Sequence, residues 1–317
     1  MYSNIKAPMH RRKALQGLAS ASLASITSIT TLGCSNTADN PDVSVLLTLS
    51  EVLTGEHRIP FTLINKDGSR IHGATIKASF YKLQDQHDEF MFSTTVAEHS
   101  IAISQNHIHK DGEVHEHLHN SDYYLAVGKA FEPGLWRANL EIQPTNGREY
   151  TKSTFFDVQD QSQTPMVGDP IPPSVNPVIV DPGDIGNIST ADPPVAGMYR
   201  HTVAACLDRA EPMVIAFSTP AFCRSQMCGP VTAVAAELYN RWKDHVRFIH
   251  IEPFDLAAAR TDGQLTFTPV AREWNLKTEP SIFVIDTGGH VTTRFEGIVS
   301  PDELEPSIKA VATPARA

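Results

Sequence analysis

Thr219-Pro-Ala-Phe-Cys-Arg-Ser-Gln-Met-Cys-Gly-Pro230 is the stretch that determines the fold of the last third of the chain. It separates an apolar run over residues 213–217, typical of a buried strand, from a helical pattern over residues 230–244. In a regular helix, the Cα atoms of Cys223 and Cys228 would lie on the order of 8 Å apart, beyond the ~7 Å limit for a disulfide. Either the helix unwinds or Cys223 lies in the loop before it. Gly229-Pro230 favours the loop, because proline suits the first position of a helix.

Cysteines that bracket a loop at the start of a helix have a distinctive chemistry. The partial positive charge of a helix N-terminus favours thiolate over thiol and lowers the pKa of a cysteine there. Arg224 adds a nearby cation. We therefore expect a reactive thiol in this loop.

The rest of residues 201–317 alternates between strand and helix patterns. Buried strands are predicted at 246–251 and 281–286, the second forming a hairpin with 290–295, and a short helix is predicted at 268–274. The last helix is expected to start at Ser300, with Glu303 completing a capping box. This order predicts an α/β sandwich.

Strand, cysteine loop, Gly-Pro and helix, followed later by Glu279-Pro280-Ser281, resemble the thioredoxin fold. The closest resemblance is to exported thioredoxin-like proteins with the signature Thr-Pro-Ala-Phe-Cys-x4-Cys-Gly-Pro. It implies a thiol–disulfide oxidoreductase that acts on a protein thiol or disulfide client and requires no cofactor. In that interpretation Cys223 attacks, Cys228 resolves the mixed disulfide, and Pro280, in the cis form, presents a backbone edge to the client.

Several positions depart from the thioredoxin pattern. Four residues, not two, separate the cysteines, Ala216 stands where thioredoxins have a buried acid, and Phe222 stands where they have tryptophan. Glu279 would oppose thiolate formation if it lay close to the sulfurs. A structural Cys223–Cys228 disulfide on a non-catalytic scaffold therefore remains an alternative.

Other uses of the cysteines are less well supported by the residues. Thiol peroxidases of this fold need threonine three residues before the attacking cysteine, where this chain has Pro220. Cys206 lies in a helical run and is expected to be a buried small hydrophobe.

The first 33 residues are predicted to be an export signal. Their basic N-terminal part and mildly apolar, uncharged centre fit a signal of this kind and not a membrane-spanning helix. Residues 10–16 resemble a twin-arginine signal, and Thr31-Leu-Gly-Cys34 resembles a lipobox. We expect Cys34 to be lipidated, with residues 34–41 as a polar tether to a membrane in the cell envelope or periplasm.

Two further segments lie between this tether and the thioredoxin-like domain. Residues 42–158 show short alternating strands separated by turn signals, which predict an immunoglobulin-like antiparallel β-sandwich. Residues 159–200 contain eight of the 22 prolines and are predicted to be an extended linker. The fold class is thus a two-domain protein, with the β-sandwich preceding the α/β domain.

A histidine-rich hairpin is a candidate site for copper or zinc. If Asp111-Gly112 forms a two-residue loop, the histidines of the two strands lie on opposite faces; one additional residue brings them together. A solvated polar loop is the alternative interpretation. The candidate ligands are His107, His109, His115, His117 and His119.

Copper handling is a competing interpretation of the whole chain. The Sco-type copper proteins also carry a thioredoxin fold, but they use Cys-x3-Cys and a distant histidine, a spacing that this chain does not match. The dithiol could then serve as metal ligands or reduce the cysteines of a client.

Charge excludes one class of partner. The 317 residues carry a formal net charge of −10, and loss of the four cations of the signal leaves about −14. A nucleic-acid binder would show a basic face, so we expect no nucleic-acid partner. The sequence gives no indication of oligomeric state.

Overall fold

The computed structural model of the protein describes residues 41–312, apart from residues 86, 109–113 and 224. The predicted export signal, Cys34 and most of the tether therefore lie outside the described residues, as does Arg224. Within the part of the chain that is described, no helix is both long enough and apolar enough to cross a membrane.

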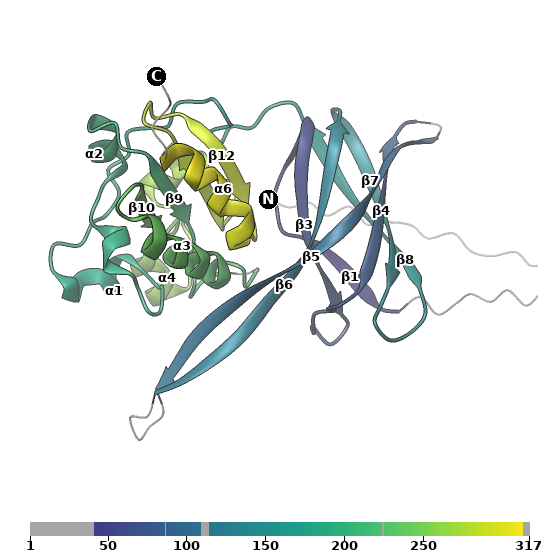
Figure 1. The fold of residues 1–317 in the computed structure, drawn as a ribbon, viewed down its shortest axis with the longest axis horizontal. Coiled ribbons are helices and arrows are strands. Elements are labelled where there is room, and N and C mark those ends of the chain that lie inside the picture. Colours follow the sequence, from purple (N-terminus) through teal and green to yellow (C-terminus); the bar gives the residue numbers. More distant parts are fainter. Residues whose placement is uncertain (1–40, 86, 109–113, 224, 313–317) are drawn as a thin grey trace, which may run out of the picture. The chain divides into compact units, whose positions relative to one another are not determined.

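Residues 43–159 contain eight strands in the described chain, hydrogen-bonded in the order β1-β3-β6-β5-β4-β7-β8-β2 (Figure 1). All neighbouring pairs are antiparallel except β2 and β8. The strands are β1 (Val43–Leu47), β2 (Val52–Leu53), β3 (Gly55–Asn65), β4 (Thr75–Leu83), β5 (Asp88–Ile108), β6 (Val114–Phe131), β7 (Gly134–Gln143) and β8 (Tyr150–Gln159).

Alternating side chains form the core of this sheet. In β7, Trp136, Ala138, Leu140 and Ile142 are buried while their neighbours are more exposed, because successive side chains of a strand point to opposite faces. They pack into one cluster with buried residues of β1, β3, β4, β6 and β8. The predicted antiparallel, β-rich character of this region is confirmed.

The strands form one continuous curled sheet, where the sequence predicted the two sheets of a sandwich. The reason is the length of β5, 21 residues. Its first part pairs with β4, up to Val96 opposite Ile76, and its second part pairs with β6, beginning at Ala97 opposite Leu125. A single strand thus belongs to both halves of the sheet.

Residues 159–200 are more than an extended connector. Ile171 is buried in a cluster with residues of β9 to β12, and its N–H donates to Gly289 O at 3.0 Å. Met198 and Tyr199 are buried against α3 and the four-stranded sheet. Apolar residues between the prolines thus anchor the segment, which also forms η1 (Pro182–Asp184), α1 (Ile185–Ile188) and η2 (Ala196–Tyr199).

Residues 203–312 have the predicted alternation of strands and helices. Four strands of the described chain lie in the order β10-β9-β11-β12, with β10 and β9 parallel and the other pairs antiparallel. This order supports the thioredoxin-like fold expected from the sequence. The elements are α2 (Val203–Asp208), β9 (Met213–Phe217), α3 (Cys228–Trp242), β10 (Arg247–Ile251), α4 (Leu256–Asp262), α5 (Pro269–Glu273), β11 (Ser281–Ile285), β12 (Val291–Glu296) and α6 (Pro301–Ala312).

The predicted capping box of the last helix is present. Ser300 N–H donates to the Glu303 carboxylate at 3.2 Å, and Glu303 N–H donates to Ser300 Oγ at 3.4 Å. Two donors that the helix itself leaves unpaired are thereby satisfied.

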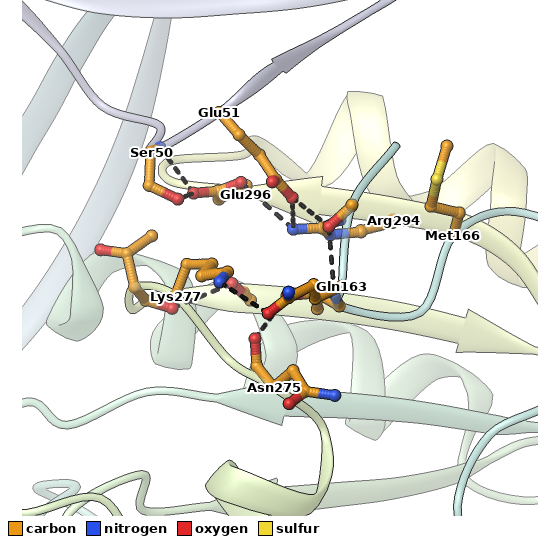
Figure 2. A network of polar contacts seen from close by, with 12 residues as sticks. Ser50, Glu51, Gln163, Met166, Asn275, Lys277, Arg294 and Glu296 are labelled. Atoms are coloured by element: carbon orange, nitrogen blue, oxygen red, sulfur yellow. Dashed lines mark hydrogen bonds and ion pairs between the residues drawn. The ribbon is translucent and has the colours of Figure 1, made fainter. Parts of the chain in front are cut away.

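A buried ionic network connects β12 to the residues before β2 (Figure 2). Arg294 lies 2.8 Å from a Glu51 oxygen and 3.3 Å from a Glu296 oxygen, and it also donates to Ser162 Oγ at 3.2 Å. Glu296 in turn accepts from Ser50 N–H at 2.6 Å. The Arg294 side chain is 10% exposed and that of Glu51 is 6% exposed. Loss of one partner from such a buried network leaves an uncompensated charge.

A second ion pair lies beside this network. Arg58 donates through Nε and Nη2 to one Glu303 oxygen, at 3.1 and 2.9 Å. Burial, followed by the positive charges of Arg58 and Arg294, lowers the pKa of His57 to about 4. His57 is therefore neutral at physiological pH.

Candidate functional site

Cys223 lies in the loop before α3, and Cys228 is the first residue of that helix. The arrangement favoured by Gly229-Pro230 is therefore the one observed. Cys228 N–H donates to Cys223 Sγ at 3.2 Å, and Ser225 Oγ lies 3.2 Å from the same sulfur. The sulfur of Cys223 thus lies at the positive end of a 15-residue helix.

The two cysteines differ in their protonation. Hydrogen bonds from Cys228 and from Ser225 lower the pKa of Cys223 to about 5, against the opposing effect of burial. Burial, together with the neighbouring Cys223, raises the pKa of Cys228 far above its ordinary value. At neutral pH the partly exposed Cys223 is a thiolate, and the fully buried Cys228 keeps its proton. Both are free cysteines in this structure.

Glu279 and Pro280 lie beside the sulfurs. The peptide bond between them is cis, as expected. A Glu279 carboxylate oxygen, Cys223 Sγ and Cys228 Sγ all lie within 4.8 Å of one another. The negative charge of Glu279 opposes thiolate formation at Cys228, since it is among the causes of the raised pKa of that cysteine.

Cys223, Cys228 and Glu279 could together hold a metal ion. Two sulfurs and a carboxylate are ligands that Zn²⁺ accepts in proteins, with a fourth position left for water or substrate. Among the described residues, this is the group of three potential metal ligands whose side-chain atoms lie close enough together to hold one ion.

The histidine hairpin has the register that the metal hypothesis requires. His107 pairs with His115 and Gln105 with His117, while Ile108 opposite Val114 excludes the two-residue loop. His109 and the Asp111-Gly112 turn lie outside the described residues, and so do the side chains of residues 103–119. Metal binding by these histidines stays a prediction.

A buried chain of hydrogen bonds runs from Cys228 into the core. Thr232 Oγ1 donates to Cys228 O at 2.7 Å, Ser218 Oγ lies 2.6 Å from Thr232 Oγ1, and His250 Nε2 lies 2.8 Å from Ser218 Oγ. Tyr199 OH lies 2.7 Å from His250 Nδ1. Burial lowers the pKa of His250 to about 4, so it is a neutral core residue.

Sequence reasoning missed a buried acid next to the cysteine loop. Glu252 follows β10 and accepts from Thr190 N–H and Oγ1 at 2.6 and 2.7 Å. Thr190 Oγ1 also accepts from Ala221 N–H in the cysteine loop, at 3.1 Å. Burial raises the pKa of Glu252. Its position directly after the buried strand β10 is the signal in the sequence, whereas Ala216, where thioredoxins have a buried acid, lies on the neighbouring strand β9.

Cys206 is buried in α2, as predicted. Burial raises its pKa to about 11, followed by the effect of Glu211. Thiolate chemistry at neutral pH is therefore confined to Cys223 among the described cysteines.

Known proteins show only weak similarity to this chain. No protein-family model matches the sequence, and no curated protein matches it. A solved thiol:disulfide interchange protein of the thioredoxin family from Chlorobium tepidum TLS is similar over 46% of this chain and 98% of its own, at 16% identity and a TM-score of 0.26. A conjugative transposon lipoprotein from Bacteroides eggerthii DSM 20697 is similar over 36% of this chain and 96% of its own, at 8% identity and a TM-score of 0.17.

At these TM-scores neither likeness bears on function. Function is therefore argued from the site itself, which contains a thiolate at a helix N-terminus, a buried partner thiol and a cis-proline.

Proposed function

We propose that the protein is a thiol–disulfide oxidoreductase in which Cys223 attacks and Cys228 resolves. The observation that carries this proposal is the hydrogen bond from Cys228 N–H to Cys223 Sγ at the N-terminus of α3. Cys223 is partly exposed and Cys228 is fully buried, and their sulfurs lie within 4.8 Å of each other. A structural pair has no need of this asymmetry.

The reaction balances with the client alone. The Cys223 thiolate attacks one sulfur of a client disulfide, a Cys223–client disulfide forms, and the second client sulfur leaves as a thiolate. Cys228 then loses its proton to solvent and attacks Cys223 Sγ as a thiolate. The Cys223–Cys228 bond forms, and the first client sulfur leaves. Two electrons pass from the dithiol to the client, and the reverse sequence oxidises a client dithiol.

Three neighbouring groups support these steps. Ser225 donates a hydrogen bond to the attacking sulfur, and the α3 N-terminus stabilises its negative charge. Pro280 would present a backbone edge to the client, as in the proteins that the sequence resembles.

Trapping the intermediate tests the proposal. With 2-hydroxyethyl disulfide, the reduced Cys228→Ser variant should accumulate a stable adduct at Cys223, seen by mass spectrometry. The wild type should instead end as the Cys223–Cys228 disulfide, and Cys223→Ser should form no adduct in this loop. An equal yield of adduct at Cys223 in wild type and Cys228→Ser would contradict the assigned resolving role.

Metal handling is the second candidate function, favoured by the close approach of Cys223, Cys228 and Glu279. Reduced wild type should then bind one Zn²⁺ or Cu⁺ tightly, while Glu279→Gln binds it more weakly and the oxidised protein not at all. Loss of tight binding only on replacing His115, His117 and His119 would assign the metal to the hairpin instead. If the protein is instead a non-catalytic scaffold, neither metal binding nor turnover of disulfide substrates is expected.

We also propose the architecture and location expected from the sequence. Residues 42–158 would be a module that recognises the client or a metal, in which the two halves of the curled sheet, joined through β5, correspond to the two sheets of an immunoglobulin-like sandwich. Residues 201–317 would be the catalytic domain. Lipidated Cys34 would anchor the chain to an envelope membrane. Cys34→Ala should move the protein from the membrane fraction to the soluble fraction; retention in the membrane would rule out this anchor.

A further inference from the structure

A groove of about 610 Å³ lies beside the cysteine loop, within the size range of protein ligand sites. Pro220 and Ala221, just before Cys223, form one part of its lining, and Gly229 on α3 forms another. Gly229 follows Cys228, whose N–H lies 3.2 Å from Cys223 Sγ. The groove is therefore lined by residues that lie close to both cysteines along the chain.

The opposite wall comes from the proline-rich segment. Thr190 lines the groove and is held by Glu252 at 2.6 and 2.7 Å, and it accepts from Ala221 N–H at 3.1 Å. Tyr199 also lines the groove, fixed by Ser189 and His250, each at 2.7 Å. These hydrogen bonds hold the wall formed by the proline-rich segment in place and link it to the cysteine loop, so the groove is present before a client binds.

The lining has a definite chemical character. Its floor is apolar, with Val195, Met198 and Ala233 among the lining residues. Two carboxylates, Asp192 and Glu237, lie at exposed positions, and the described lining contains no lysine, arginine or histidine. Glu237 is paired with Arg241 at 2.7 Å, whereas no ion pair of Asp192 is found within the described residues. Asp192 is thus available to a cation from outside.

We infer that this groove binds the polypeptide segment next to the reacting cysteine of the client, and selects segments with apolar side chains and a lysine or arginine. The inference rests on the proposed function and extends it to the class of client. The apolar floor supplies contact area, while Asp192 supplies charge complementarity and faster association. Anionic small disulfides such as oxidised glutathione would be disfavoured by the same acidic rim.

The test compares two peptides that differ at one residue. Each carries one cysteine as a mixed disulfide with thionitrobenzoate, flanked by leucines, with lysine or glutamate two positions away. Attack by the Cys223 thiolate forms the Cys223–peptide disulfide and releases thionitrobenzoate, whose absorbance gives the rate. Full-length reduced protein is used, and each rate is divided by that with neutral 2-hydroxyethyl disulfide.

At low salt the wild type should prefer the lysine peptide by about tenfold. Asp192→Lys should bring this ratio to about one or below, and Asp192→Asn, which changes the fold least, should give an intermediate ratio. Asp262→Lys makes the same charge change at an exposed position outside the groove and should keep the wild-type ratio. Replacing the leucines by serines should slow the lysine peptide.

Two results would overturn the inference while leaving the oxidoreductase intact. One is equal rates for the two peptides in the wild type. The other is equal loss of preference in Asp192→Lys and Asp262→Lys, which would assign selectivity to the overall charge. Failure of every probe to react, the neutral disulfide included, would refute the proposed function and the inference with it.

Discussion

Replacing Ser225 by alanine should raise the pKa of Cys223 by about one unit, from about 5 to about 6. The hydroxyl lies 3.2 Å from the sulfur, and a hydrogen bond to a charged group contributes about 1.5–3 kcal/mol. Because Cys223 is partly exposed, the lower end applies. One pKa unit corresponds to about 1.4 kcal/mol.

The assay is the rate of alkylation by iodoacetamide between pH 4 and pH 9, since only the thiolate reacts. A Cys34→Ala background removes a thiol outside the described residues, while Cys206 and Cys228 are buried with raised pKa values. Ser225→Thr keeps the hydroxyl and is the matched control. An unchanged midpoint in Ser225→Ala would refute the role of this hydrogen bond. A wild-type midpoint near the ordinary cysteine value would refute the helix-terminus argument as a whole.

Three other predictions concern stability. Relative to Cys223→Ser, the reduced wild type should gain unfolding free energy as pH rises from about 5 toward 9. The lowered pKa of Cys223 stabilises the folded state fully above the unfolded-state pKa of this cysteine. That stabilisation is lost as pH falls through its folded-state pKa. Urea denaturation at several pH values checks this, and parallel curves would contradict it. His57 and His250 are neutral in the fold and protonate when unfolded, so unfolding free energy should fall between pH 6.5 and 4, and replacing both by glutamine should flatten this slope. Arg294→Met should lower the unfolding free energy by about 3–5 kcal/mol, because it leaves buried carboxylates unpaired. Lys66→Met, which removes an exposed ion pair, should lower it by less than about 1 kcal/mol. Equal losses in the two variants would show that the buried network is not stabilising.

Local signals in the sequence predicted much of the site. Gly229-Pro230 placed the start of α3 within two residues of its observed position at Cys228, and Ser300 with Glu303 located α6. The cis form of Pro280 was expected from the thioredoxin-like resemblance, and the Glu279–Pro280 peptide bond is cis. Each of these features depends on residues that are neighbours along the chain, so a pattern could reveal it.

Features that depend on tertiary pairing were not predictable. Glu252 approaches Ala221 only because β10 pairs beside β9 and Thr190 packs between them. The proline-rich segment was expected to be a linker, since proline content indicates extended backbone but not what that backbone packs against. The single curled sheet depends on the two partners of β5, which periodicity along one strand does not specify.

The reduction potential of the Cys223–Cys228 couple, titrated against glutathione, tests the central claim most directly. A redox-active pair with a stabilised thiolate should have a potential between about −120 and −270 mV, the range of thiol–disulfide oxidoreductases. Stabilisation of the reduced form by the α3 N-terminus favours the upper part of this range. A potential below about −300 mV, resistant to the glutathione pool, would identify a structural disulfide and contradict the proposed function.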